Sequence, residues 1–362
     1  MRILVAALLL MAGPAAAQQR WVTAWVAPAQ SLSDVPSLGA DQTARVIVRP
    51  SVWSSRARLR LSNAAGTTPL VIGGVFAGVQ SGGAALVPGT NKPVTFASNR
   101  TVTIPPGGQV WSDPVVLPRQ GPAMAVSLHW TGQASSGHAH SPGTSYLTSA
   151  GAGALGELED EGVFSHATSA VPVLDAVDIQ PAGDIPVVLC LGDSLTAGVG
   201  AIPNARDGWT NVLERRLRAT GWTGIVLNAG LAQDRGPAAR LDRDVFSLSG
   251  VTHVIWLHGA DELAADASTD AVRDGMVRML RQLREKLPRA KLLLGMLPGA
   301  DLPGRWPLNV QLRALPFDGM IPFDRVDAAN PTSFAGQLAM GEVIDLRLIT
   351  GPGSIRRAAA PN

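Results

Sequence analysis

Residues 187–198 read VVLCLGDSLTAG, and this stretch decides the fold of the second half of the chain. Five apolar residues end abruptly in Gly192-Asp193-Ser194, and small residues that suit a helix follow. A buried parallel strand that turns into a helix in this way presents a serine hydroxyl at the carboxyl end of the strand, where a helix N-terminus supports negative charge. The pattern therefore predicts an open parallel sheet with Ser194 at its ligand-binding edge.

The rest of the second half alternates strands and helices from residue 185 onward. Apolar runs at 225–227, 251–257 and 292–297 predict further strands. Apolar residues at helical spacing predict two helices, one carrying Trp209, Val212, Leu213 and Leu217, the other Val272, Met276, Met279, Leu280 and Leu283. Alternation of this kind is typical of a parallel sheet with right-handed crossovers.

The first half has the pattern of β-structure from residue 20 to about 150. Polar and apolar residues alternate strictly from Arg56 to Leu61, as in a half-buried strand. Turn signals at 63–66, 88–91 and 105–108 separate such runs. Many short strands at this spacing predict a β-sandwich or jelly roll.

The composition agrees with two globular domains. The chain has 362 residues, of which 46% are hydrophobic and 16% charged, and its formal net charge is +2. It contains no basic run of the kind that nucleic-acid binders use, so we expect no nucleic-acid partner. Cys190, the one cysteine, cannot form an internal disulfide and lies inside the predicted buried strand. We find no phosphate loop and no cysteine or histidine spacing typical of a metal site, and expect neither cofactor nor metal.

The N-terminus has the pattern of a secretory signal. Arg2 is followed by an apolar segment, Ile3 to Met11, and by the small residues 15–17. The apolar segment is too short to span a bilayer unaided, so we expect a secreted or periplasmic protein without stable membrane insertion. The expected organisation is a signal peptide over 1–17, a β-sandwich domain over 20–150, a linker and strand over 151–183, a parallel-sheet domain over 184–350 and a flexible tail over 351–362.

Two further stretches carry chemistry, namely 226–235 (VLNAGLAQDR) and 257–263 (LHGADEL). Together with 187–198 they resemble the motif blocks of the SGNH, or GDSL, ester hydrolases. Residues 58–63, 69–73 and 111–115 resemble the β-rich N-terminal domain of one branch of that family. The resemblance implies a flavodoxin-like doubly wound parallel sheet, the SGNH hydrolase fold, preceded by a β-sandwich or jelly-roll domain.

The same resemblance implies hydrolysis or deacylation of a carbohydrate or lipid ester without a cofactor. Ser194 falls on the nucleophile, and Gly230 on the glycine whose backbone N–H stabilises the oxyanion. Asp261 occupies the place of the family asparagine, whose side chain donates to the oxyanion. Since an ionised carboxylate has no hydrogen to donate, this substitution weakens the expected oxyanion hole.

The family's Asp-x-x-His block is incomplete. Either Asp327 supplies its acid and Asn330 replaces its histidine, or the block is deleted and the chain rejoins the family at 339–346. Both alternatives lose the general base, because the chain has no histidine beyond His258. His258 follows the strand at 251–257 and is a weak candidate for a substitute base, although a structural strand-end histidine is the simpler interpretation. His138 and His140 are expected in a solvated loop.

These observations predict the geometry at Ser194 and leave two alternative functions. Ser194, Gly230 and Asp261 are expected to meet at the carboxyl edge of the parallel sheet, with no imidazole within hydrogen-bond reach of the Ser194 hydroxyl. The protein is either an exported ester hydrolase with Ser194 as nucleophile, its activity impaired or lost, or a non-catalytic module that binds a carbohydrate or ester. The ester or glycan and the oligomeric state stay open.

Overall fold

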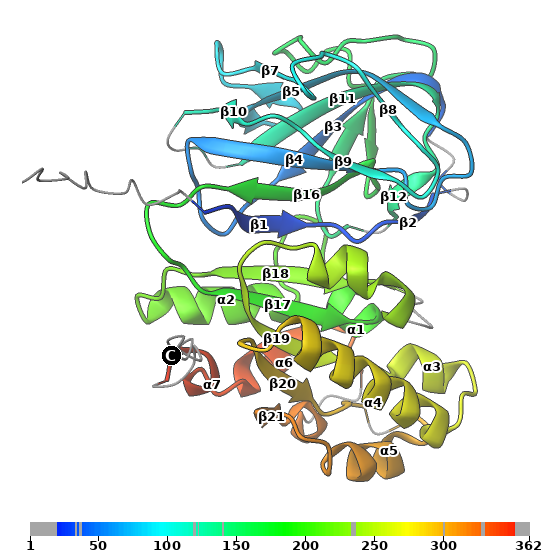
Figure 1. Cartoon of the computed structure of the whole chain (residues 1–362), viewed down its shortest axis with the longest axis vertical. Helices are drawn as coiled ribbons and strands as arrows, with labels where there is room; N and C mark the ends of the chain where they lie inside the picture. Colours follow the sequence, from blue (N-terminus) through cyan, green and yellow to red (C-terminus); the bar gives the residue numbers. More distant parts are fainter. Residues whose placement is uncertain are drawn as a thin grey trace, which may run out of the picture.

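Two domains are stacked along the long axis of the molecule, a β-rich domain above an α/β domain in Figure 1. The computed structural model describes residues 20–32, 35, 38–118, 121, 123–139, 141–232, 237–299, 301–326 and 330–351. The expected signal peptide (1–17), the tail from residue 352, His140 and Asp327 lie outside the described residues.

The N-terminal domain is a sandwich of antiparallel sheets. One sheet has the order β1-β16-β4-β10 with β9 also on β4, the other has the order β14-β13-β3-β11-β5-β6 with β7 and β8 also on β5, and a small third sheet has the order β15-β12-β2. The strands are β1 (Val22–Val26), β2 (Gln30–Ser31), β3 (Ala40–Val48), β4 (Arg56–Ser62), β5 (Leu70–Gly82), β6 (Ala85–Leu86), β7 (Lys92–Val94), β8 (Val102–Ile104), β9 (Gln109–Trp111), β10 (Val115–Val116), β11 (Met124–Gln133), β12 (Ser136–His138), β13 (Ser145–Leu147), β14 (His166–Thr168), β15 (Val171–Pro172) and β16 (Leu174–Ile179). The β-sandwich expected from the alternating pattern is confirmed.

The segment 151–183 does more than link the domains. It supplies β14, β15 and β16, one strand to each of the three N-terminal sheets. β16 lies between β1 and β4, where Ile179 pairs with Val22 on one side and with Ala57 on the other. The first and last strands of the sandwich are therefore neighbours, and the chain leaves it beside the point where it entered.

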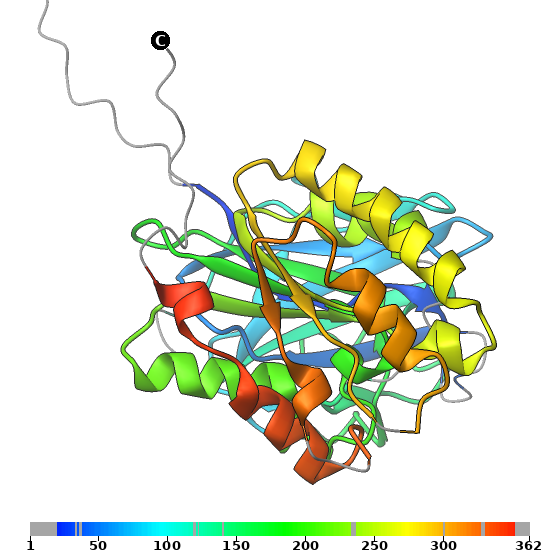
Figure 2. The same cartoon turned by 90° about the horizontal axis from the view of Figure 1, so that it is seen from below.

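The second domain is a doubly wound parallel sheet. Its strands are β17 (Val187–Gly192), β18 (Ile225–Gly230), β19 (Val251–Leu257), β20 (Lys291–Gly295) and β21 (Gly319–Ile321), and its helices are α1 (Ser194–Ala197), α2 (Trp209–Ala219), α3 (Ala260–Ala264), α4 (Thr269–Lys286), α5 (Arg305–Leu312), α6 (Phe334–Val343) and α7 (Arg347–Thr350). The strand order β18-β17-β19-β20-β21 is the flavodoxin-like order. Figure 2 shows α2 and α6 on one face of the sheet and α4 and α5 on the other. The predicted fold class is confirmed.

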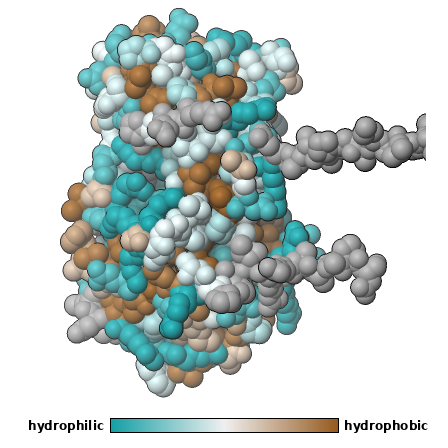
Figure 3. All heavy atoms as spheres, turned by 90° about the vertical axis from the view of Figure 1, so that its left-hand side faces the viewer, coloured by the Kyte–Doolittle hydropathy of each residue, from teal (hydrophilic) through white to brown (hydrophobic). Residues whose placement is uncertain are grey.

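One hydrophobic core runs through both domains. In the parallel sheet every residue of β17 is buried, and Trp209 at the start of α2 packs against Phe323 with ring centroids 5.3 Å apart. On the face shown in Figure 3, hydrophilic and hydrophobic residues are interspersed over both domains, as is usual for a globular protein. No helix in the described ranges is long and apolar enough to cross a membrane.

Polar contacts fix the two domains against each other. Arg60 on β4 pairs with Asp175 on β16 (Nε to Oδ1, 2.7 Å) and also donates to the hydroxyl of Ser247 in the second domain. The backbone N–H of Ser249 donates to Thr23 Oγ1 at 2.8 Å. Because β1 also packs beside β18 across the boundary, residues of both domains can contribute to one cleft.

Candidate active site

Ser194 begins α1 directly after the buried strand β17. The preceding Asp193 caps this helix, since its side chain accepts from the N–H of Leu195 at 3.2 Å. A side chain at Gly192 would place its Cβ 2.0 Å from the carbonyl oxygen of Leu257, so only glycine allows the neighbouring strand to approach this closely. The sequence pattern thus positions Ser194 at the carboxyl edge of the sheet, as predicted for the fold.

Asp193 joins the loop after β17 to the loop after β19. Its Oδ2 accepts from three consecutive backbone N–H groups, those of residues 259–261, at 3.1, 2.8 and 3.3 Å. Burial raises the pKa of the Asp193 carboxyl, because burial disfavours the charged form, whereas the nearby His258 acts in the opposite direction. Through these bonds Asp193 holds the start of α3 in place and with it the backbone of Asp261.

Ser194 and Asp261 form the centre of the site. The Ser194 hydroxyl donates to Oδ1 of Asp261, and the Ser194 backbone N–H donates to Oδ2 of the same carboxylate at 3.2 Å. Both hydrogens of Ser194 that could serve an acyl substrate are therefore directed at one carboxylate. The expectation that these two residues meet at the edge of the sheet agrees with this geometry.

His258 is buried and lies beside Glu262 instead of Ser194. Its Nε2 is 3.0 Å from Oε2 of Glu262, one helical turn further along the chain. In the part of the chain that the structure describes, the hydrogen bond of the Ser194 hydroxyl goes to Asp261 and not to an imidazole. The structure therefore gives no geometric support to His258 as a substitute base.

Gly230 ends β18, where its Cα is paired with that of Gly192. Its N–H donates to Oδ1 of Asn228 at 2.9 Å, and a Cβ on Gly230 would lie 2.0 Å from the backbone nitrogen of Ala197. The close approach of α1 explains the glycine without any catalytic role. Its assignment as an oxyanion donor stays a prediction, since this N–H already has an acceptor two residues earlier in β18.

The hydrogen bond between Gly230 and the Asn228 side chain could have been predicted from the sequence. An asparagine side chain commonly accepts from the backbone N–H two residues further on, and Asn-x-Gly fits such a turn. By contrast, no sequence pattern indicated that the N-terminal domain contributes to the site. A cavity of about 460 Å³ opens onto Ser194 and Asp261, and its other wall includes Ser141, Pro142 and Ser169 of the sandwich domain. This volume is within the usual range for a small-molecule site.

The segment around the missing Asp-x-x-His block runs beside this cavity. The carbonyl oxygen of Thr332 lies 1.9 Å from the place that a Cβ on Gly200 would take, and Gly200 lines the cavity. Oδ1 of Asn330 accepts from the N–H of Thr332 at 3.0 Å, and Ser333 caps α6. Asn330, in the histidine position of one alternative, thus bonds within its own turn.

The structure places His138 differently from the expectation. His138, expected in a solvated loop, is buried in β12, and its Nδ1 lies 3.0 Å from the carbonyl oxygen of Pro28. That expectation was wrong, because the short strand β12 pairs with β15 from a part of the chain far along the sequence. Among the described residues, no group of three or more histidine, cysteine, aspartate or glutamate side chains could hold a metal ion.

Comparison with known proteins identifies a family for part of the chain. Residues 190–317 match the GDSL-like lipase/acylhydrolase family. This part of the chain belongs to that family. We therefore refer to the parallel-sheet domain as the GDSL domain. No curated protein matches the sequence.

Several solved structures are similar to the chain. The SGNH-hydrolase family esterase AlinE4 is 25% identical over 40% of this chain and 79% of its own, with a TM-score of 0.32. A lipase/acylhydrolase from Enterococcus faecalis is 20% identical over 49% of this chain and 100% of its own, with a TM-score of 0.37. A family two carbohydrate esterase from Clostridium thermocellum, in complex with cellohexaose, is 11% identical over 91% of this chain and 93% of its own, with a TM-score of 0.40.

Proposed function

We propose that the GDSL domain binds a carbohydrate or lipid ester in the cleft at Ser194 and does not hydrolyse it through Ser194. One observation carries this proposal, namely that the hydroxyl and the backbone N–H of Ser194 both donate to the carboxylate of Asp261. In an efficient serine esterase these two groups face a general base and the substrate oxygen.

The first deficiency concerns the base. A serine hydroxyl becomes an effective nucleophile when a neighbouring imidazole takes its proton, and a carboxylate is a much weaker base than an imidazole. In the described chain the acceptor of the Ser194 proton is Asp261. Loss of the histidine from a serine triad costs about a million-fold in kcat.

The second deficiency concerns the oxyanion hole. The N–H of Ser194 is bonded to Asp261, and the N–H of Gly230 is bonded to Asn228. Asp261 itself, when ionised, offers no donor and repels a developing negative charge. Since each lost donor costs about a hundred- to a thousand-fold in rate, the two deficiencies together leave little of the family's chemistry.

The cleft still suits a ligand. Its volume of about 460 Å³ and its walls from both domains are those of an ordinary small-molecule site. The signal-like segment over residues 1–17 supports a secreted or periplasmic location for this binding.

A second candidate function rests on the same hydrogen bond. Because the Ser194 hydroxyl donates directly to Asp261, the carboxylate is placed to accept its proton in a slow esterase without histidine. The two candidates differ in what Asp261 does, since it blocks the oxyanion site in the first and activates Ser194 in the second.

Turnover of p-nitrophenyl acetate by the purified protein and by Ser194→Ala tests the proposal. We expect equal rates within experimental error, because Ser194 lacks an effective base. Ser169→Ala, which changes another serine of the same cavity, provides the matched control for non-specific surface hydrolysis. Saturable turnover that Ser194→Ala abolishes and Ser169→Ala retains would contradict the proposal and favour the slow esterase.

A further inference from the structure

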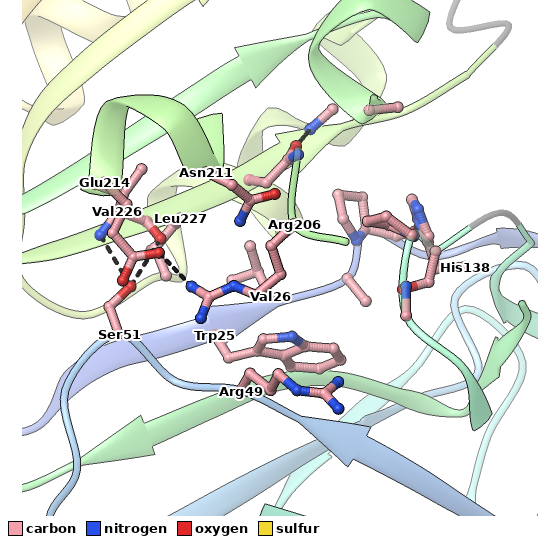
Figure 4. Close-up of a pocket in the computed structure, with 18 of the residues that line it drawn as sticks. Trp25, Val26, Arg49, Ser51, His138, Arg206, Asn211, Glu214, Val226 and Leu227 are labelled. Atoms are coloured by element: carbon pink, nitrogen blue, oxygen red, sulfur yellow. Dashed lines mark hydrogen bonds and ion pairs between the residues drawn. The ribbon is translucent and has the colours of Figure 1, made fainter. Parts of the chain in front are cut away.

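A second cavity lies at the boundary between the two domains. Its volume is about 140 Å³, and it shares Ser141 and Pro142 with the cleft at Ser194. Figure 4 shows side chains entering it from β1, from the end of β3 and from α2. An engineered cavity of about 150 Å³ accommodates benzene, so a cavity of this volume suits one six-membered ring.

Arg49 gives this cavity a positive charge without a balancing acid. It is partly buried, and within the described chain it forms no hydrogen bond or ion pair. Burial, together with the like charge of Arg206, lowers the pKa of Arg49. Arg206 itself is paired with Glu214 at 2.7 Å. An arginine held in a cavity without an acidic partner is placed to receive an anion from outside.

Three other groups indicate what kind of molecule carries that anion. Trp25 of β1 lines the cavity and is only partly buried, so an indole surface is available to a ring. Asn211 of α2 also lines the cavity. An amide and the carboxylate of Glu214 are hydrogen-bonding partners for hydroxyl groups, which a sugar acid carries and benzoate lacks.

We propose that this interdomain pocket binds a carboxylated sugar, whose carboxylate pairs with Arg49 and whose ring lies against Trp25. Asn211 and Glu214 bind its hydroxyl groups. This binding is independent of whether Ser194 hydrolyses an ester. Because the pocket adjoins the cleft at Ser194 through Ser141 and Pro142, one acidic glycan chain can occupy both.

Titration of the purified protein with glucuronate tests this site, with glucose as the neutral ring and benzoate as the ring without hydroxyls. We expect saturable binding of glucuronate and at least tenfold weaker binding of glucose and of benzoate. Arg49→Gln should weaken glucuronate binding by about tenfold or more, since a hydrogen bond to a charged group contributes that much. Arg56→Gln, an exposed arginine of β4 outside the pocket, should bind like the wild type.

A second variant keeps the test valid if Arg49→Gln does not fold. Asn211→Ala should weaken glucuronate binding by about threefold or more, as expected for one neutral hydrogen bond, with an unchanged melting temperature. Equal glucuronate affinity in Arg49→Gln and wild type would overturn the proposal. It would also be overturned by no binding of glucuronate, by equal binding of glucose, or by preferred binding of benzoate.

Discussion

Replacing Asp261 by asparagine is expected to produce a measurable Ser194-dependent rate of p-nitrophenyl acetate cleavage, which the wild type lacks, because one oxyanion donor contributes about a hundredfold in rate. Asparagine has nearly the shape of aspartate but carries an amide that donates to an oxyanion. With the amide nitrogen in the place of Oδ2, the N–H of Ser194 also loses the acceptor that holds it at 3.2 Å in the wild type. Rate measurements on Asp261→Asn with and without Ser194→Ala isolate the part that depends on the serine.

Asp261→Ala separates the effect of removing the negative charge from the effect of adding a hydrogen-bond donor. It removes the negative charge without supplying a donor, so its gain should be smaller than that of the asparagine variant. A decrease in Ser194-dependent rate for Asp261→Asn would show that the carboxylate acts as the base for Ser194, and our assignment of Asp261 as a blocking group would be wrong.

Asp175→Ala is expected to destabilise the protein by about 3–5 kcal/mol, because it leaves a buried guanidinium without its partner. The side chains of Arg60 and Asp175 are only 3% and 1% exposed, and Gln109 donates to the same carboxylate. Since Arg60 also donates to Ser247 across the boundary, the loss should loosen the contact between the domains.

Chemical denaturation, followed by tryptophan fluorescence, measures this effect as a lower midpoint. Asp345→Ala removes the acid of an exposed ion pair with Arg347 and is the matched control, for which we expect no comparable loss. Equal midpoints for Asp175→Ala and the wild type would show that the buried pair does not hold the domain boundary together.

The parallel sheet was predictable because its signals are local. The strands β17, β18, β19 and β20 are short apolar runs, the helices α2 and α4 have a 3.6-residue period, and the turn after residue 192 marks the edge where ligands bind. The flavodoxin-like strand order was implied by the resemblance to the SGNH hydrolases, since right-handed crossovers restrict the order of strands without fixing it. The presence of Asp261 at the place of the family asparagine was visible in the same way, because the motif at 257–263 is a short continuous stretch.

The rest of the site depends on contacts that leave no local pattern. β16 pairs with β4 more than a hundred residues earlier, and this pairing buries Asp175 beside Arg60. Likewise, Arg49 and Asn211 are distant in the sequence and line one cavity only because the domains are stacked. The direction of the Ser194 hydroxyl was also not predictable, since it depends on how Asp193 positions the start of α3.

Labelling of the protein with a fluorophosphonate, followed by intact-mass spectrometry, tests most directly whether Ser194 is an activated nucleophile. Such reagents phosphonylate a serine whose proton is taken by an effective base, whereas a hydroxyl that donates to Asp261 without imidazole assistance should not react. We therefore predict no mass increase on prolonged incubation. A stoichiometric adduct on the wild type that Ser194→Ala lacks would contradict this account.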